Sequence, residues 1–137
     1  MKAVLTAPAA VLVALWGPAA AAAADPAAMS PPFIDHTEWA QWRGLSSLRV
    51  FPTPSGRLAA GQSGNATLAD EAWAEVLALS PDADTAGMRA QFICHWQFAE
   101  LAAPGKTSWN LEPWRPVVDD AEMVASGCNP GGPEERF

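Results

Sequence analysis

The sequence predicts a small α+β domain: a small antiparallel sheet, one main helix at about residues 68–79, a short C-terminal helix at about residues 119–125, and one disulfide. Three observations lead to this fold class. Segments with the two-residue alternation of strands lie on both sides of one segment with helical periodicity. The chain holds two cysteines, Cys94 and Cys128, so each is the other's one intramolecular partner. Its 137 residues are enough for a single domain.

The first 24 residues have the pattern of a secretory signal peptide. Lys2 precedes an apolar run, and Ala22-Ala23-Ala24 matches the small-residue pattern at which signal peptidase cleaves. A membrane anchor is the alternative. However, Pro8, Gly17 and Pro18 interrupt the run, and alanine drives insertion only weakly. We therefore expect a secreted or cell-envelope-associated protein that is not stably inserted in the membrane after cleavage.

The remainder divides into a leader and a domain. Residues 25–32 are rich in proline and alanine and are expected to form a mobile leader, while residues 33–137 are expected to form one secreted globular domain. The formal net charge of −7 argues against nucleic acid and against anionic membranes as partners. Because disulfides persist outside the cytoplasm, export predicts that Cys94 and Cys128 are bonded.

Two extended segments are expected before the main helix. Residues 33–42 mix apolar and polar positions; a short helix is the alternative, because Trp39 and Trp42 are three residues apart, but an extended conformation is favoured. Residues 47–51 alternate in polarity and are followed by a proline, as strands often are. Residues 52–56 contain two prolines and a glycine and are expected to form a turn.

The two helices have recognisable ends. We expect Thr67 to be the N-cap of the main helix and Ser80-Pro81 to end it. Its apolar residues fall on one stripe, which consists of Leu68, Ala72, Trp73, Val76 and Leu77. Residues 119–125 form the short second helix, with acids in its first turn and Gly127 after its end.

Residues 88–96 are expected to be the central strand. One set of alternating residues comprises Met88, Ala90, Phe92, Cys94 and Trp96, and the other comprises Arg89, Gln91, Ile93 and His95. The face with Cys94 is assigned to the core because it holds the disulfide and the largest side chains, which leaves Arg89 and His95 on the other face. Residues 108–114 are also expected to be extended, and the prolines there and just beyond demote them to an edge strand or a loop.

Three motifs match a known family. They are Gly87-Met88-Arg89-x-Gln91-Phe92-x-Cys94-His95-Trp96, Lys106-x-Ser108-Trp109-Asn110-Leu111-Glu112-Pro113-Trp114-Arg115-Pro116 and Cys128-Asn129-Pro130-Gly131-Gly132. With them, residues 39–134 resemble the secreted, mainly actinobacterial proteins grouped as domain of unknown function 2599. The resemblance implies an exported domain, and it supplies no activity, ligand or catalytic residue.

The sequence contains no complete catalytic or metal-binding signature. Cys94 and His95 would point to opposite faces of the predicted strand and could not share a zinc ion. A calcium-type loop that begins at Asp82 lacks the later oxygen ligands, and Gly61 to Asn65 lacks the final glycine of a nucleophile elbow. We therefore expect no metal and no cofactor, and we assign no catalytic residue.

The candidate binding residues are Arg89, His95, Trp109, Glu112, Trp114 and Arg115. Tryptophan faces bind sugar rings and other flat or apolar groups, and charged neighbours orient a polar ligand. Trp39 and Trp42 lie in similar polar surroundings and extend this candidate surface. The alternatives are that the tryptophans pack in a small core under loops and that Glu112 pairs with Arg115 or Arg89.

Three functions are compatible with these features. A secreted, non-catalytic binding module for a cell-envelope glycan or protein is favoured, with its ligand, partner and oligomeric state left open. A small polysaccharide hydrolase would use Glu112 and a second acid such as Glu38. A proteinaceous inhibitor or secreted effector would insert the disulfide-pinned tail, Asn129 to Pro133, into a partner's cleft.

Overall fold

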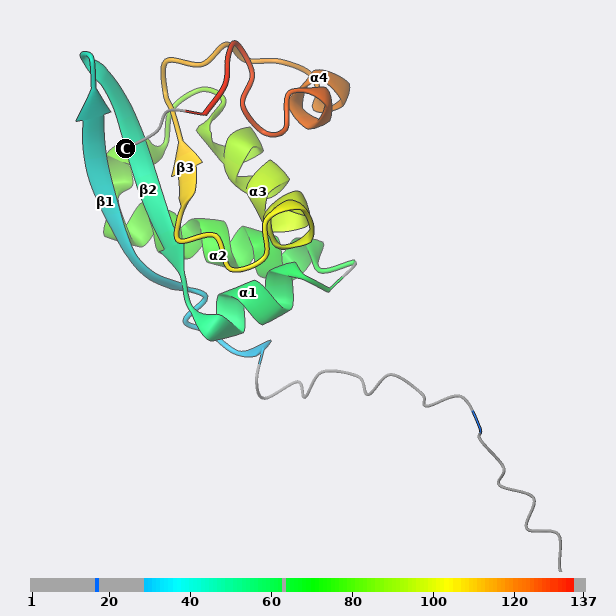
Figure 1. Ribbon diagram of the computed structural model, residues 1–137. Helices are drawn as coiled ribbons and strands as arrows, with labels where there is room; N and C mark the ends of the chain where they lie inside the picture. Colours follow the sequence, from blue (N-terminus) through cyan, green and yellow to red (C-terminus); the bar gives the residue numbers. More distant parts are fainter. Residues whose placement is uncertain (1–16, 18–28, 63, 135–137) are drawn as a thin grey trace, which may run out of the picture.

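The computed structural model describes residues 17, 29–62 and 64–134, so the predicted cleavage site and residues 25–28 of the predicted leader lie outside the described residues. The elements are β1 (Ile34–Trp42), β2 (Leu45–Pro52), α1 (Pro54–Ala60), α2 (Ala66–Leu79), η2 (Pro81–Ala83), α3 (Met88–Ala102), β3 (Trp109–Leu111) and α4 (Asp120–Ala125). The predicted α+β class, with a small antiparallel sheet and one disulfide, is confirmed (Figure 1). Within the described residues, no helix is long and apolar enough to cross a membrane.

The sheet has the order β1-β2-β3, and both pairs are antiparallel. β1 and β2 form a hairpin whose two turn residues, Arg43 and Gly44, have φ values of 50° and 78°, as a tight two-residue hairpin turn requires. The extended conformations predicted for residues 33–42 and 47–51 are confirmed, and the segment from residue 108 contributes the short edge strand β3.

Helices α2 and α3 pack on one face of the sheet, and the core lies between them (Figure 1). Phe92 of α3 is the centre of an aromatic cluster: its ring centroid lies 5.5 Å from Trp73 of α2 and 6.2 Å from Trp109 of β3. Trp96, one turn further along α3, meets Trp109 edge-on at 6.2 Å. These large rings join two helices and the sheet in one core, because each buries a large apolar area at every contact.

The prediction of a central strand at residues 88–96 was wrong: these residues form the first part of α3. Met88, Phe92 and Trp96 are four residues apart, and this spacing satisfies a two-residue repeat and a helical repeat equally well. The helix runs for 15 residues, longer than strands usually are, and its full length distinguishes the two repeats. As a result Gln91 and His95, one turn apart, are buried rather than solvent-facing, at 1% and 4% exposure.

The prediction of a turn at residues 52–56 was wrong: Pro52 ends β2, and α1 begins at Pro54. Thr53 is its N-cap, and the hydroxyl of Thr53 accepts the N–H of Gly56 at 2.9 Å. Pro54 fits the first turn, where an N–H has no partner within the helix. Gly56 is required by a close approach: a Cβ there would lie 2.1 Å from the carbonyl oxygen of Phe33.

The other predicted helices are confirmed, with one corrected end. α2 begins at Ala66 with Asn65 as N-cap, so Thr67 lies inside the first turn and does not cap the helix. Its apolar stripe faces the core as predicted. α4 has Asp119 as N-cap, and the Asp119 carboxylate accepts the N–H of Glu122 at 2.8 Å.

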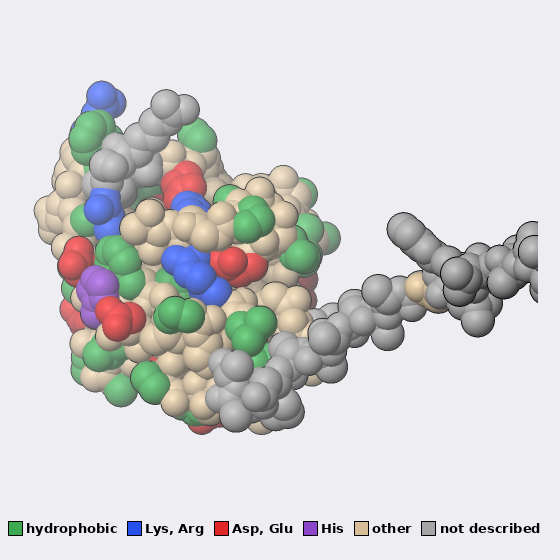
Figure 2. All heavy atoms as spheres, turned by 60° about the horizontal axis from the view of Figure 1, so that its bottom comes forward, with side chains coloured by type: hydrophobic (Ala, Val, Ile, Leu, Met, Phe, Trp, Pro, Cys, Tyr) green, Lys and Arg blue, Asp and Glu red, His purple; other side chains and the backbone are tan. Residues whose placement is uncertain are grey.

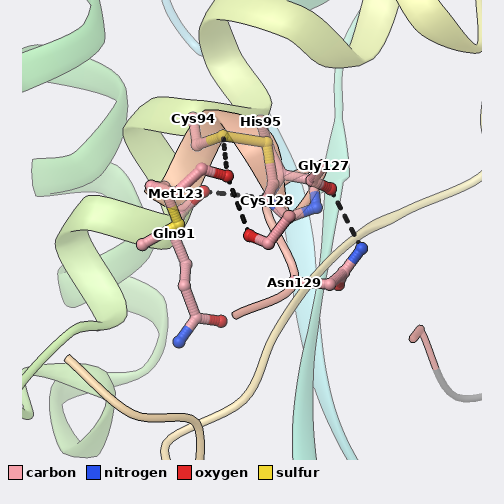
Figure 3. Close-up of a disulfide and its surroundings, with 8 residues drawn as sticks. Gln91, Cys94, His95, Met123, Gly127, Cys128 and Asn129 are labelled. Atoms are coloured by element: carbon pink, nitrogen blue, oxygen red, sulfur yellow. Dashed lines mark hydrogen bonds between the residues drawn. A yellow bond between two sulfur atoms is a disulfide. The ribbon is translucent and has the colours of Figure 1, made fainter. Parts of the chain in front are cut away.

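The disulfide joins α3 to the segment that follows α4 (Figure 3). Cys94 and Cys128 have Cα atoms 5.6 Å apart and pack with Met123 and Val118 in a second, smaller apolar cluster. The bond closes a separation of 34 residues. On the chain-entropy model a loop of this size contributes roughly 3–4 kcal/mol to stability, so the bond secures α4 and the tail to the helical core.

Candidate functional site

The six residues predicted to bind a ligand lie at different depths. Arg89 is exposed and Trp114 is half-buried, whereas four are buried: His95, Trp109, Glu112 and Arg115. A side chain without exposed surface cannot touch a ligand on the protein's exterior. The structure brings Glu112, Trp114 and Arg115 together, but it does not assemble all six into one exposed surface.

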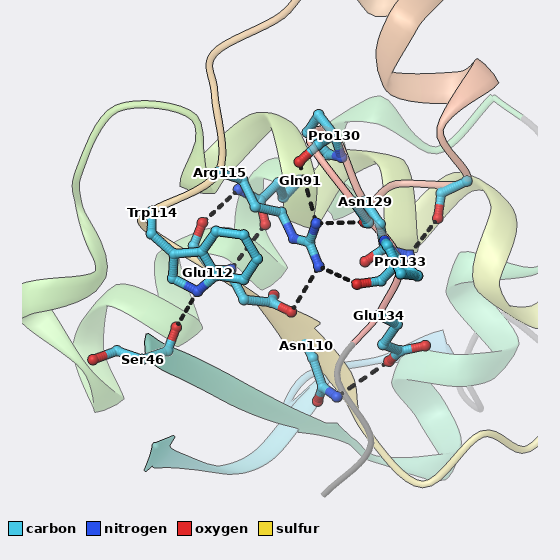
Figure 4. Close-up of polar contacts among 12 residues, drawn as sticks. Ser46, Gln91, Asn110, Glu112, Trp114, Arg115, Asn129, Pro130, Pro133 and Glu134 are labelled. Carbon is cyan, nitrogen blue, oxygen red and sulfur yellow. Dashed lines mark hydrogen bonds and ion pairs between the residues drawn. The ribbon is translucent and has the colours of Figure 1, made fainter. Parts of the chain in front are cut away.

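Arg115 holds the C-terminal tail against the domain (Figure 4). Its guanidinium donates to the carbonyl oxygens of Pro130 at 3.1 Å, Gly132 at 2.7 Å and Pro133 at 3.2 Å. It also donates to the Glu112 carboxylate at 3.4 Å, and both side chains of this ion pair are buried. Because these groups use the guanidinium's donors on both terminal nitrogens, Arg115 acts as an internal clamp.

Glu112 and His95 both form hydrogen bonds with Gln91 of α3. The Gln91 side chain donates to the Glu112 carbonyl and accepts the Glu112 N–H, each at 2.9 Å, and it thereby joins α3 to the end of β3. The His95 Nδ1–H donates to the Gln91 carbonyl at 2.8 Å. Burial lowers the pKa of His95 to about 4, so this histidine is neutral at physiological pH. Burial also raises the pKa of Glu112, and the charge of Arg115 only partly opposes this effect.

The carboxylate pair of the hydrolase hypothesis is not assembled among the described residues. Glu38 is exposed on β1, where it contacts His36 Nε2 at 3.4 Å, and β2 lies between β1 and the strand that precedes Glu112. Arg89, the other predicted partner of Glu112, forms an exposed ion pair with Asp70 instead. Glu112 is therefore paired with Arg115 inside the fold.

Two tryptophans of the β1–β2 hairpin are exposed, Trp39 by 39% and Trp42 by 40%. The Trp39 indole donates to Asp82 of η2 at 3.3 Å, and the Arg43 guanidinium lies 5.7 Å from the centroid of the Trp42 ring. Trp114 is anchored at the same end of the sheet, because its indole donates to the Ser46 carbonyl at 3.0 Å. The hairpin thus presents aromatic surface that the core does not use.

A groove of about 840 Å³ lies beside α3. It lies between α3, the start of α2 and the connection from α1, which is fixed by a hydrogen bond from Asn65 Nδ2 to the Ala59 carbonyl at 3.1 Å. Its apolar lining is Ala60, Ala66, Ala69, Ile93, Trp96, Phe98 and Leu101. The Asp70–Arg89 pair, Gln62, Asn65 and Gln97 supply the polar groups.

The sequence interpretation missed this groove because it treated residues 88–96 as a strand and stopped there. Helical spacing applied to the longer segment would place Ile93, Gln97 and Leu101 on one stripe, distinct from the core stripe of Phe92 and Trp96. A smaller hollow of about 550 Å³ lies on the other side of this stripe, toward α4. The stripe is therefore a ridge between two hollows.

Charged side chains on one face of the molecule are mixed in sign (Figure 2). On the face drawn in Figure 2, Lys and Arg side chains lie beside Asp and Glu side chains, with hydrophobic side chains between them. Within the residues that the structure describes, no group of three or more His, Cys, Asp and Glu side chains is placed to hold a metal ion. Cys94 is bonded to Cys128, and this bond, rather than the strand geometry first assumed, removes its thiol from metal chemistry.

Comparisons with known proteins agree with the three sequence motifs. Residues 34–131 match the family described as "Protein of unknown function (DUF2599)". The chain is 62% identical, over the whole of both chains, to "Uncharacterized protein Rv0477" of Mycobacterium tuberculosis (strain ATCC 25618 / H37Rv) and to "Uncharacterized protein Mb0487" of Mycobacterium bovis. It is 61% identical to "Uncharacterized protein ML2452" of Mycobacterium leprae, over 73% of this chain and 80% of that protein. No solved structure matches it significantly. The family match covers most of the chain, and the protein therefore belongs to the DUF2599 family.

Proposed function

We propose that the protein is an exported, non-catalytic binding module and that its groove beside α3 takes the apolar part of a small ligand, such as an acyl chain. The groove is the observation that carries this proposal. Its volume of about 840 Å³ falls within the range of small-molecule pockets, and apolar side chains line most of it. Phe98 and Leu101 remain 37% and 71% exposed at its edge, so a ligand would cover apolar surface that now faces water.

The lining favours an apolar chain over a sugar. Sugar hydroxyls need hydrogen-bond partners along the whole binding site, and here apolar atoms make up most of the surface that lines the groove, beside five polar or charged side chains. Of the tryptophans expected to bind a glycan, Trp109 is fully buried in the core. A cell-envelope component with a hydrocarbon portion is therefore the ligand class that fits best.

The hydrolase and inhibitor hypotheses receive less support. Glu112 is buried against Arg115, away from Glu38, so the pair has no shared groove in which a sugar could sit. The tail from Asn129 to Pro133 lies against the domain, and Arg115 occupies its backbone carbonyls. An inhibitory loop would instead need to project those groups toward a partner.

The test uses protein recovered from the culture medium of an actinobacterial host. The first residue of this secreted protein is expected to be Asp25. Titration with a dansyl-labelled fatty acid should give saturable fluorescence. Leu101→Glu should weaken binding by roughly tenfold or more, since it removes one apolar side chain from the contact. Leu79→Glu, at an exposed apolar position at the end of α2 and outside the groove, is the matched control and should bind like the parent.

Two results would contradict the groove. One is the absence of saturable binding by the parent protein. The other is an equal loss of affinity in the Leu79 and Leu101 variants, which would indicate nonspecific adsorption to apolar surface. Protein found only in the cell pellet, with its first residues intact, would contradict export.

A further inference from the structure

The free edge of β1 is a second feature that the binding groove does not explain. β1 is nine residues long and occupies one end of the strand order, with β2 and β3 on its other side (Figure 1). It contains neither lysine nor proline, which natural proteins commonly place on edge strands to prevent pairing with another chain, and its β-bulge lies at its start, between Ile34 and His36, so the edge from His36 to Trp42 is regular. A long edge without these blocking residues can pair with another strand.

The hairpin register identifies the backbone groups on that edge. Ser46 of β2 lies opposite Gln41 of β1, yet the Ser46 carbonyl accepts the Trp114 indole on the side away from β1. The Gln41–Ser46 pair is therefore one in which the two residues do not bond each other, and the N–H and C=O of Gln41 point outward. Because the direction alternates along an antiparallel strand, Trp39 and Thr37 also point their backbone groups outward. Within the described residues, no hydrogen bond from another segment reaches these groups.

We propose that a second copy of the chain pairs with this edge, β1 against β1 in antiparallel orientation, to form a continuous six-stranded sheet. The two-fold axis passes at Trp39, so Trp39 lies opposite its equivalent and Thr37 lies opposite Gln41. This register matches outward-facing residues on both strands, as hydrogen-bonded pairs require. A two-fold interface uses the same patch on both subunits, and β1 paired in this register is self-complementary.

Charge and exposed aromatic surface select this register. Asp35, at the β-bulge between Ile34 and His36, comes near Arg43 of the partner copy's hairpin turn, and the two-fold axis repeats this opposite-charge contact at the other end of the interface. A two-fold axis at Glu38 would instead place two carboxylates face to face, which is destabilising. The dimer also covers two of the exposed aromatic side chains of each copy, since Trp39 meets its equivalent and Trp42 lies beside the partner copy's His36 position.

The oligomeric state in solution tests whether the edge of β1 is a dimer interface. Sedimentation of the full-length secreted protein over a wide concentration range should show a concentration-dependent dimer. Trp39→Lys places two like charges at the two-fold axis and should leave the protein monomeric with an unchanged circular dichroism spectrum. Val124→Lys substitutes an exposed apolar residue on α4, far from β1 in the strand and helix arrangement, and should remain dimeric.

A charge reversal tests the register. Asp35→Arg and Arg43→Asp should each weaken dimerisation by roughly tenfold, because each creates two like-charge pairs. The double variant, D35R together with R43D, should restore the parent's dimer affinity. A parent that is monomeric at every concentration, a dimeric Trp39→Lys variant, or a double variant that stays as weak as the single ones would each overturn the proposal.

Discussion

Replacing Arg115 with methionine tests the account of the buried clamp. Methionine keeps much of the apolar stem and removes the guanidinium, which has no exposed surface and donates to Glu112 and to three tail carbonyls. Removing one partner of a buried ion pair costs about 3–5 kcal/mol, because the other charge stays desolvated. The tail carbonyls can regain water if the tail lifts, so the carboxylate of Glu112 accounts for most of this loss.

Thermal unfolding followed by tryptophan fluorescence measures the effect. For a domain near 100 residues, a loss of about 3 kcal/mol lowers the melting temperature by roughly 12 °C or more. Arg89→Met is the matched control, because the side chains of its ion pair with Asp70 are 56% and 63% exposed. An exposed pair contributes about 0–1 kcal/mol at most. If Arg115→Met loses no more stability than Arg89→Met, the clamp is not a stabilising feature.

The pH dependence of the Arg115→Met loss identifies its source. Burial already raises the pKa of Glu112 above 4.5, and loss of the arginine raises it further. The folded state then holds a proton that the unfolded state has released, so stability falls as pH rises through the interval between the two pKa values. The loss should therefore be small near pH 4, where Glu112 is protonated in both states, and larger near pH 7. An equal loss at both pH values would exclude Glu112 as its cause.

Two further predictions concern single positions. Burial lowers the pKa of His95 from 6.5 to about 4, so the unfolded state takes up a proton before the folded state does as the pH falls. The free energy of unfolding should therefore decrease by roughly 3 kcal/mol as the pH falls from 6.5 to about 4. His95→Gln should lose much of this acid sensitivity in urea melts, and an unchanged pH profile would contradict the assignment. Gly56→Ala should cost roughly 1–3 kcal/mol, since its Cβ would lie 2.1 Å from the Phe33 carbonyl oxygen. Gly61→Ala, whose nearest neighbour is 3.5 Å away, is its control, and equal melting temperatures would refute the close contact.

Local signals in the sequence were sufficient for the elements whose ends and faces depend on near neighbours. The acids after Asp119 predicted α4, and Ser80-Pro81 correctly marked the end of α2. The pairing of Cys94 with Cys128 followed from their being the two cysteines of a chain that we expect to be exported, and the structure confirms the bond. These inferences hold because caps and prolines act on near neighbours in the chain, and because two cysteines leave one possible intramolecular pairing.

Only the tertiary structure decided the conformation of residues 88–96 and the depth of the candidate site. An apolar residue at every fourth position suits a strand and a helix alike. The helical conformation lets Phe92 contact Trp73 and Trp109, and it lets Trp96 contact Trp109. The same contacts buried Glu112 with Arg115 and opened the groove on the other side of α3. Burial depends on which distant segments pack together, and the spacing of residues along one segment carries no record of that packing.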